Sequence, residues 1–316
     1  MSAADSCNNA VLPGLVSTAR QSIVPVVEQV PLARDTFRLR LECPDLALQV
    51  TPGQFFMIRA PGMTNPLLGR PFALYDTYLD PAGEPAGIDV VYLVVGKMTA
   101  LMRTWTTGDP VELWGPLGNG FPTVSSRKLL MVAGGIGNTP FLAVARSALG
   151  RRRYGNSSTG NGAAGSGSMH VVPPGAVTFC YGARSAEYLA GLQDFTTLGI
   201  DLRIATDDGS RGHHGFVTEI AAAALRESTG TAALSADASD ECAIYCCGPE
   251  RMMHAVALLA EKHHVPCWLS LETPMACGFG ACFSCVTRVR LPAGDWDYRR
   301  VCVEGPIFPA SQLFWK

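Results

Sequence analysis

The chain has 316 residues, of which 47% are hydrophobic and 16% charged, and its formal net charge is −2. This composition can bury ordinary cores, and because no basic stripe stands out, it argues against nucleic-acid binding. The N-terminus lacks a basic region followed by an apolar one, and no stretch approaches about 18 continuous apolar residues. We therefore expect a soluble cytoplasmic protein without a secretory signal or a membrane span.

The first half of the chain has the pattern of an antiparallel barrel. Residues 1–20 read as a weakly structured leader. Over residues 21–125, short segments rich in β-branched and aromatic residues alternate with turns that contain Pro, Gly or Asp. Several short strands at regular spacing are typical of a barrel. The predicted strands are 23–30, 36–41, 55–59, 72–75, 89–95 and 111–114.

The pattern changes at Lys128, after which apolar runs alternate with helical segments. This alternation predicts βαβ units and a parallel sheet, which we expect to form an α/β nucleotide-binding domain over residues 126–264. Flexible polar insertions near 151–172 and 227–241 interrupt it. The predicted strands are 129–133, 177–181, 202–205 and 243–246, and the predicted helices run to about 149 and over 186–192, 218–226 and 250–262.

The last unit, residues 265–316, contains Cys277, Cys282, Cys285 and Cys302. Their C-x4-C-x2-C…C order is that of plant-type [2Fe–2S] sites. A structural zinc site is the main alternative, although zinc sites usually pair their Cys in two C-x2-C-like units and only one pair here meets that spacing. Buried thiols with no metal are the third interpretation. Because this unit is too short to build a sizeable core alone, a metal centre would supply the missing cross-links.

Three barrel segments stand out, the first of which is a candidate for binding a pyrophosphate. Arg70-Pro71-Phe72-Ala73 opens a predicted strand, where a guanidinium can fork onto a pyrophosphate. Val91-Tyr92-Leu93 and Met98-Thr99 follow after one hairpin. An ordinary strand and turn explains each segment equally well when it is taken alone.

Three segments of the α/β domain are candidates for binding a nicotinamide nucleotide. Gly134-Gly135-Ile136-Gly137 follows an apolar strand and opens a helix, so its N–H groups can meet a pyrophosphate, although a tight turn is an equal alternative. Cys247-Gly248-Pro249 lies at the carboxyl end of the last predicted strand, where a thiol can contact a nicotinamide or the residues can simply start a helix. Asp207 can accept hydrogen bonds from a ribose or cap a turn.

The order of these motifs resembles the ferredoxin-reductase superfamily, and within it the electron-transfer subunits of type B dihydroorotate dehydrogenases. The resemblance covers residue 22 to the C-terminus. In addition to the motifs above, it includes the loop 115–121, the segment 181–185 and the cluster motif that begins at Glu272. Two departures are visible: Ala73 stands where the family usually has Ser, and Met98 where it usually has Gly.

The resemblance implies a flavin-binding barrel, a nucleotide-binding domain and a small [2Fe–2S] domain. FAD would lie between the first two, anchored by Arg70 and Thr99, and Cys247 would face the nicotinamide of NAD. An FMN-containing dihydroorotate dehydrogenase catalytic subunit would be the partner, in a heterotetramer. Electrons would pass through the cluster and FAD to NAD⁺, in pyrimidine (UMP) biosynthesis.

The residues alone are also compatible with two other functions. The chain can be the flavin and cluster subunit of another NAD(P)H-linked complex, of the bifurcating ferredoxin–NADP reductase or hydrogenase type. It can also be a zinc-stapled interaction module on a degenerate reductase fold. The residues do not distinguish NAD from NADP.

Overall fold

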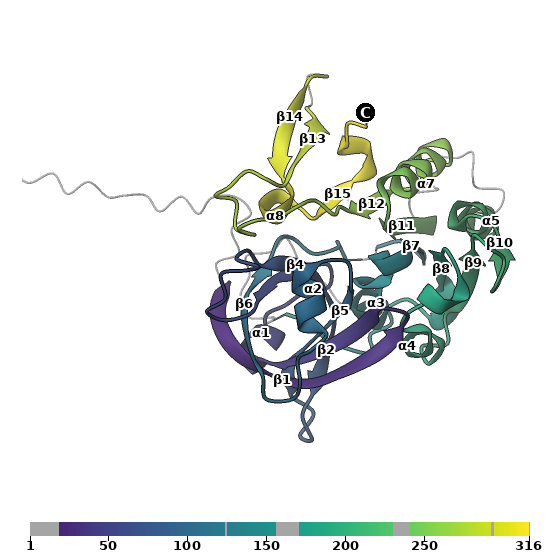
Figure 1. The fold of residues 1–316 in the computed structure, drawn as a ribbon. Coiled ribbons are helices and arrows are strands. Elements are labelled where there is room, and N and C mark those ends of the chain that lie inside the picture. Colours follow the sequence, from purple (N-terminus) through teal and green to yellow (C-terminus); the bar gives the residue numbers. More distant parts are fainter. Residues whose placement is uncertain (1–18, 124, 156–170, 230–240, 292–293, 316) are drawn as a thin grey trace, which may run out of the picture.

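The computed structural model describes residues 19–315 except 124, 156–170, 230–240 and 292–293. The expected leader lies outside the described residues apart from its last two, as does much of both insertions. Figure 1 shows a barrel in purple and blue, an α/β domain in teal and green, and a yellow C-terminal unit over the junction of the two. None of the described helices is long and apolar enough to cross a membrane.

The barrel is a closed antiparallel sheet with the strand order β1-β2-β5-β4-β3-β6. It confirms the predicted strands, most of which extend further than expected. Two short helices, α1 (Pro44–Ala47) and α2 (Lys97–Met102), were not predicted. The strands are β1 (Arg20–Ala33), β2 (Thr36–Glu42), β3 (Phe55–Arg59), β4 (Arg70–Leu79), β5 (Pro85–Leu93) and β6 (Pro110–Leu117).

The α/β domain is built on a seven-stranded sheet with the order β10-β9-β8-β7-β11-β12-β15, parallel except at β15. From β7 the chain builds β8, β9 and β10 on one side and then returns to β11 on the other. The strands are β7 (Lys128–Gly134), β8 (Val177–Ala183), β9 (Asp201–Thr206), β10 (His213–His214), β11 (Cys242–Cys247), β12 (Cys267–Ser270) and β15 (Ile307–Pro309).

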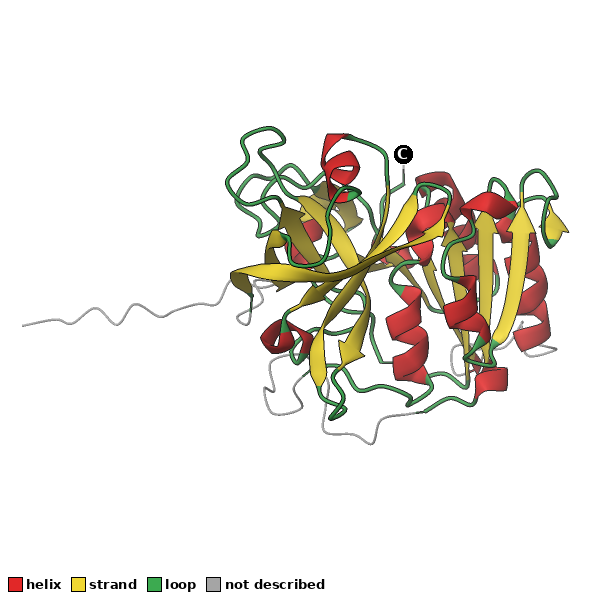
Figure 2. Ribbon diagram, turned by 60° about the horizontal axis from the view of Figure 1, so that its bottom comes forward, coloured by secondary structure: helices red, strands yellow, loops and turns green. Residues whose placement is uncertain are grey.

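Helices cover both faces of this sheet (Figure 2). Because successive strand residues point to opposite faces, Leu130 and Val132 pack with α5 and α7, whereas Leu129 and Met131 pack with α3 and α4. The helices are α3 (Phe141–Ala148), α4 (Leu192–Thr196), α5 (Val217–Thr229) and α7 (Glu250–Lys262), with short 3₁₀ turns η1 (Gly135–Asn138), η2 (Pro174–Ala176), η3 (Ala186–Tyr188) and η5 (Ala310–Gln312).

One predicted helix differs from the structure. The segment 186–192 forms only the turn η3, and α4 begins at its last residue. Gly191 interrupts the helix because its φ of +69° lies in the left-handed region. The predicted helix 250–262 agrees with α7 at both ends.

The C-terminal unit is joined to the other two through shared structure. Its strands β12 and β15 belong to the sheet of the α/β domain, while β13 (Val286–Arg290) and β14 (Trp296–Arg300) form a separate hairpin followed by α8 (Val301–Glu304). The division of the chain into domains at 20, 125 and 264 stays a prediction.

The Gly-rich loop after β6 is a junction of all three units. The Asn119 amide nitrogen donates to the carbonyls of Ile307 at 2.8 Å and Glu304 at 3.3 Å, and its side-chain oxygen accepts the Ile307 N–H at 2.9 Å. Two residues on, Phe121 stacks on Tyr245 of β11 with ring centroids 4.6 Å apart. The loop therefore fixes the barrel against both the sheet and the C-terminal unit.

We expect Asn119→Ala to lower the free energy of unfolding by about 2 kcal/mol, because it removes hydrogen bonds worth roughly 1 kcal/mol each and leaves the Ile307 backbone groups unpaired. Urea unfolding followed by tryptophan fluorescence measures the change. Glu261→Ala, at an exposed position of α7, is the control. Equal stability of the two variants would contradict the assigned role of the loop.

Candidate functional site

A crevice site is expected outside the carboxyl ends of β7 and β11, because the chain leaves these adjacent strands in opposite directions along the sheet. The loops that follow them touch backbone to backbone. A Cβ on Gly137 would lie 2.4 Å from the Cys247 carbonyl oxygen, and one on Gly248 would lie 2.9 Å from the Gly134 nitrogen. A Cβ on Gly135, in contrast, would meet nothing within 4 Å. This loop is open on that side, as a pyrophosphate-binding loop requires.

Cys247 ends β11 and is buried beside Ser270 of β12. Burial raises the pKa of the Cys247 thiol, the Glu272 carboxylate raises it further, and a hydrogen bond with Ser270 opposes both effects. At neutral pH the Cys247 side chain is therefore an uncharged thiol.

Glu272 follows β12 and acts electrostatically on the Cys247 thiol. Its side chain is exposed to solvent, and desolvation by neighbouring protein raises the pKa of its carboxyl. Sequence reasoning placed Glu272 in the cluster motif and did not identify it, or Ser270, as part of the nucleotide site, because only the pairing of β12 with β11 brings them to Cys247.

Asp207 lies at the adjacent strand ends of β8 and β9. Its N–H donates to the Ala183 carbonyl at 3.1 Å, and the Asp208 N–H donates to the Arg184 carbonyl at 3.2 Å. The Ser210 hydroxyl hydrogen-bonds Asp208 and lowers the pKa of its carboxyl. These acidic residues form an exposed turn at the same sheet edge as Gly134 and Cys247.

The predicted flavin motif opens β4, where Arg70 pairs with Ile58 and Pro71 with Met57 of β3. The Arg70 guanidinium donates to the carbonyls of Leu68 and Gly69 at 3.0 Å and is exposed. Among the described residues no acidic side chain pairs with it. An exposed, locally fixed guanidinium of this kind fits an anionic ligand such as a pyrophosphate.

The other flavin-motif side chains divide between two cores. Phe72 and Tyr92 are buried in the barrel, with their rings edge to face at 6.1 Å. Val91 is buried in the core of the α/β domain, and the neighbouring Leu93 and Ala73 are half-buried. The second flavin segment therefore lies where barrel and sheet meet.

Helix α2 holds the last predicted flavin residues. Met98 is buried in the barrel core, so its side chain leaves the backbone surface at the start of α2 unobstructed. The Thr99 hydroxyl accepts the N–H groups of Val95 at 2.9 Å and Gly96 at 3.1 Å. It therefore stabilises the turn into α2, and its predicted contact with FAD stays a prediction.

The cluster loop packs directly on the barrel. A Cβ on Gly278 would lie 2.5 Å from the Met57 side chain and 3.0 Å from Leu117, and the Trp114 indole N–H donates to the Cys277 carbonyl at 2.9 Å. Because Met57 pairs with Pro71, a single layer of residues separates the flavin strand from the cluster loop. Sequence reasoning missed Met57 and Trp114, since neither carries a motif.

The loop conformation depends on three residues with positive φ. Gly278 and Gly280 have φ of +80° and +86°, and Phe283 has +55°, a conformation in which a bulky residue is an outlier. A Cβ on Gly280 would lie 2.6 Å from Val303. These residues therefore restrict the backbone conformation of the loop that carries the cysteines.

The four thiols lie close enough together to influence one another's pKa. Hydrogen bonds from Ser284 and then from Cys277 lower the pKa of Cys282 to about 6. A hydrogen bond with Cys302 lowers the pKa of Cys285 to about 6, and the same contact raises the pKa of Cys302. Cys285 and Cys302 are buried, whereas Cys282 is exposed.

The order of the cysteines bears on the two candidate metal centres. A zinc site needs four ligands around a single point, whereas a [2Fe–2S] core has two irons that share four Cys ligands. The C-x4-C-x2-C…C order of this region fits the two-iron core.

Comparison with known proteins places these sites in a family. Residues 24–121 match the oxidoreductase FAD-binding domain, residues 131–257 the oxidoreductase NAD-binding domain, and residues 272–314 the iron–sulfur cluster binding domain of dihydroorotate dehydrogenase B. The chain is 32% identical over 297 residues to the dihydroorotate dehydrogenase B (NAD⁺) electron transfer subunit of Shouchella clausii, covering 93% of this chain and 98% of that one. It is 33% identical to that of Geobacillus thermodenitrificans, covering 91% and 96%.

Solved structures agree with the fold. A structure of an NADH-dependent reduced ferredoxin–NADP oxidoreductase superposes with a TM-score of 0.69 at 27% identity, covering 93% of this chain and 90% of that one. A cytochrome P450 reductase from Amycolatopsis, at 23% identity and a TM-score of 0.57, shares the fold over 78% of this chain and 66% of that one. With its FAD-binding, NAD-binding and iron–sulfur domains in this order, the chain belongs to the family of NAD-linked dihydroorotate dehydrogenase B electron-transfer subunits.

Proposed function

We propose that this chain receives electrons from an FMN-containing dihydroorotate dehydrogenase catalytic subunit at its cluster loop and delivers them as hydride to NAD⁺ in the crevice, within pyrimidine (UMP) biosynthesis. One observation carries the proposal. Gly278 of the cluster loop lies against Met57 of β3, and Met57 pairs with Pro71 on the flavin strand β4. Because Fe–S centres transfer one electron and nicotinamides two, a flavin between them supplies the conversion of electron number.

The residues of the chain would divide the work by location. Arg70 would bind the flavin pyrophosphate, the Gly134 loop would bind that of the nucleotide, and Cys247 would present its uncharged thiol to the nicotinamide. The proposed cofactor contacts are Arg70, Pro71, Phe72, Ala73, Val91, Tyr92, Leu93, Met98, Thr99, Gly134, Gly135, Gly137, Asp207, Gly248 and Pro249, and the proposed iron ligands are Cys277, Cys282, Cys285 and Cys302.

The partner would dock on the face around Cys282. Phe279 is 50% exposed and Phe283 63% exposed, and the Arg300 guanidinium lies 5.3 Å from the Phe283 ring centroid. The hairpin beside them exposes Trp296 and Tyr298. Exposed aromatic rings next to arginines are the composition of interface hot spots, and Phe279 and Phe283 flank the exposed Cys282 in the chain. Oxidation of dihydroorotate itself would take place on the partner, in a heterotetrameric complex.

A second candidate is the cluster and flavin subunit of another NAD(P)H-linked complex. The superposition on the NADH-dependent ferredoxin–NADP oxidoreductase favours it, because that protein shares the fold over most of both chains. Copurification with identification of the partner separates the two candidates. The match of residues 272–314 to an iron–sulfur cluster binding domain disfavours the zinc-stapled module.

We expect Cys282→Ser to slow reduction of the flavin by partner and dihydroorotate by at least about 100-fold, because the exposed iron would lose a ligand. Anaerobic stopped-flow absorbance of the complex measures this rate. Reduction of the flavin by NADH should stay within about twofold of the wild-type rate, since that route does not cross the cluster loop. Cys242→Ala, a buried thiol in β11, is the control. Full-speed reduction by the partner in Cys282→Ser would defeat the proposal.

We expect Phe283→Asp to weaken partner binding by roughly 10- to 100-fold, as for loss of an aromatic hot spot. Asp tolerates the positive φ at this position. Calorimetric titration with the catalytic subunit measures the Kd, and visible absorption confirms that the cluster is intact. Phe216→Asp, whose ring is 65% exposed on the α/β domain, is the matched control. Equal affinity of the two variants would place the partner elsewhere.

We expect Cys247→Ala to slow hydride transfer between NADH and the flavin by about tenfold, equivalent to about 1.4 kcal/mol of barrier, with a smaller effect on NADH binding. Rapid mixing with NADH, at several concentrations, separates the rate constant from the Kd. An unchanged rate constant would remove Cys247 from the site.

A further inference from the structure

Strand β4 contains a bulge two residues beyond the flavin motif. Leu74 pairs with Val90 of β5, but Asp76 pairs with Asp89, so one extra residue is inserted at Tyr75. A bulge redirects side chains that would otherwise alternate between faces. Here both Tyr75 and Asp76 contact the α/β domain.

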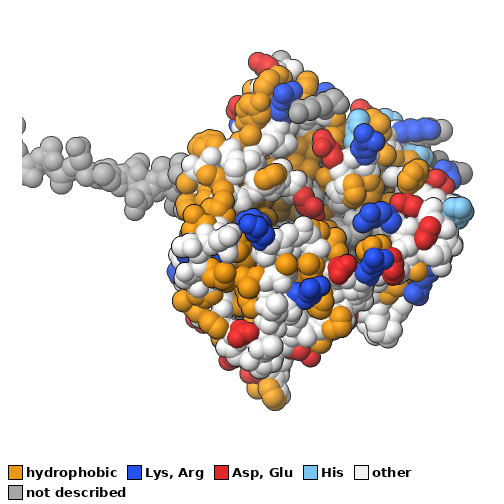
Figure 3. All heavy atoms as spheres, in the orientation of Figure 1, with side chains coloured by type: hydrophobic (Ala, Val, Ile, Leu, Met, Phe, Trp, Pro, Cys, Tyr) orange, Lys and Arg blue, Asp and Glu red, His pale blue; other side chains and the backbone are white. Residues whose placement is uncertain are grey.

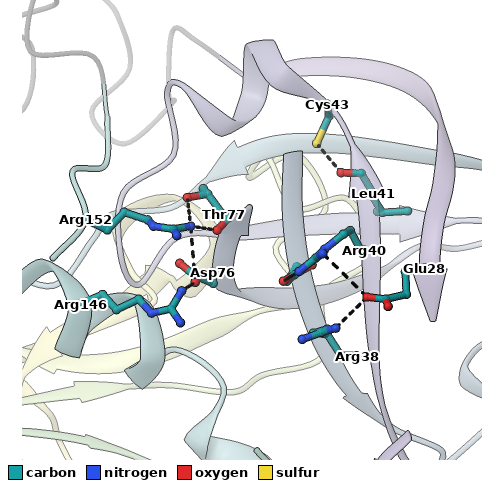
Figure 4. A network of polar contacts seen from close by, with 10 residues as sticks. Glu28, Arg38, Arg40, Leu41, Cys43, Asp76, Thr77, Arg146 and Arg152 are labelled. Carbon is teal, nitrogen blue, oxygen red and sulfur yellow. Dashed lines mark hydrogen bonds and ion pairs between the residues drawn. The ribbon is translucent and has the colours of Figure 1, made fainter. Parts of the chain in front are cut away.

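Asp76 is enclosed by groups from that domain, and only 4% of its side chain is exposed. The Arg146 guanidinium of α3 donates to its carboxylate, and Arg152 lies at 3.6 Å (Figure 4). The Tyr154 hydroxyl donates to the same carboxylate at 2.6 Å. Arg152 also donates to the carbonyl and the hydroxyl of Thr77. A barrel carboxylate is thus held by two cations and a hydroxyl that all follow the Gly134 loop in the chain.

Tyr75 makes a second contact of the same kind. Its hydroxyl donates to the Asp194 carboxylate of α4 at 2.6 Å, and its ring is buried in the core of the α/β domain. A Cβ on Gly191 would lie 2.3 Å from this hydroxyl. The left-handed Gly191 that interrupts the predicted helix therefore also makes room for the barrel.

A cavity of about 300 Å³ borders Asp76 and Arg146. Two of its arginines bond to acidic groups of the barrel itself: Arg40 to Asp89, and Arg38 to Glu28. Arg146 and Arg152, in contrast, contact Asp76 across the boundary between the domains.

These contacts connect the two elements that carry the predicted flavin and nucleotide motifs. Asp76 lies on the strand that begins with the flavin motif, and Arg146 on the helix that follows the nucleotide loop. Apolar contacts between the domains are non-directional, whereas a charge-assisted hydrogen bond defines one geometry. An ion pair at this place therefore fixes how the nucleotide loop is oriented relative to the flavin strand.

We infer that the Asp76–Arg146 pair is a positioning device for hydride transfer, which holds the nucleotide domain at the angle where the nicotinamide stacks on the flavin. The inference rests on the proposed function. Neither residue would touch substrate or cofactor; each would act through the domain that carries it. Hydride transfer needs close contact of the reacting atoms, so a small change of domain angle slows it even when the nucleotide stays bound.

The test uses the complete complex loaded with flavin and cluster. In Asp76→Asn we expect flavin reduction by NADH to slow by about tenfold and the long-wavelength absorbance of the nicotinamide–flavin contact to weaken, with the Kd of NADH within about threefold. Flavin reduction by the partner and dihydroorotate should stay at the wild-type rate. This second rate distinguishes the inference from the proposed function, because failure of the proposed function would appear in the partner-driven reaction.

Three further variants make the outcome decisive. Arg146→Lys keeps the charge and should recover most of the rate. The double variant Asp76→Asn with Arg146→Gln should be no slower than either single variant, because either substitution alone already removes the ion pair. Arg34→Gln is the control, because Arg34 also bridges the domains, to Glu187 at 2.6 Å, but both side chains are exposed. It should leave the rate unchanged.

Hydrogen exchange of the α3 amides gives a readout that does not depend on turnover, and it should accelerate in Asp76→Asn but not in Arg34→Gln. Faster exchange with an unchanged rate and unchanged nicotinamide–flavin absorbance would show that the pair is only structural, and would overturn the inference. If Asp76→Asn loses its flavin, the same measurements on Arg146→Gln decide: a normal rate there overturns the inference.

Discussion

The arrangement of the whole protein depends on how closely the backbone of a few glycines can approach its neighbours, both between the units and within the α/β domain. Gly278 lies against Met57 and Leu117 of the barrel, and Gly137 against the Cys247 carbonyl at the ends of β7 and β11. A side chain at either glycine would force its neighbours apart. These contacts set the separation of the cluster loop, the flavin strand and the Gly134 loop. The face of the molecule seen in Figure 3 is hollowed between the C-terminal unit and the barrel. Because electron and hydride transfer both weaken with distance, function depends on these glycines as much as on the groups that carry charge.

Much of the fold and the cluster could be predicted from sequence because the signals are local. The apolar runs of β7 and β11, the 13-residue helix α7 and the order of the four cysteines each lie within one segment. The contact between two of the thiols is different. Cys285 and Cys302 are brought together by the β13–β14 hairpin, so spacing alone left zinc open as an alternative. Strands β12 and β15 escaped prediction for a related reason: they are short, and their burial comes from neighbours distant in the chain.

The nucleotide and flavin sites show the same limit at the level of side chains. Ser270 and Glu272 reach Cys247 only through the pairing of β12 with β11, and no motif marks them. Met98 departs from the family pattern, and its significance could not be judged without its surroundings. In the structure its side chain is part of the barrel core, so the residue that replaced a glycine does not occupy the surface where a flavin phosphate would approach. The departure therefore concerns packing of α2 more than access to the site.

The two ends of the electron route make opposite demands on the protein, and its surfaces reflect them. Between barrel and α/β domain the contacts are enclosed and directional: Asp76 is bonded by Arg146 and Tyr154, and Tyr75 by Asp194. Around Cys282 the rings of Phe279 and Phe283 are left exposed. Hydride transfer requires two bound groups in fixed contact, so the protein must provide that geometry itself. Electron transfer from a partner tolerates a larger gap, so the geometry at the cluster can be completed by docking.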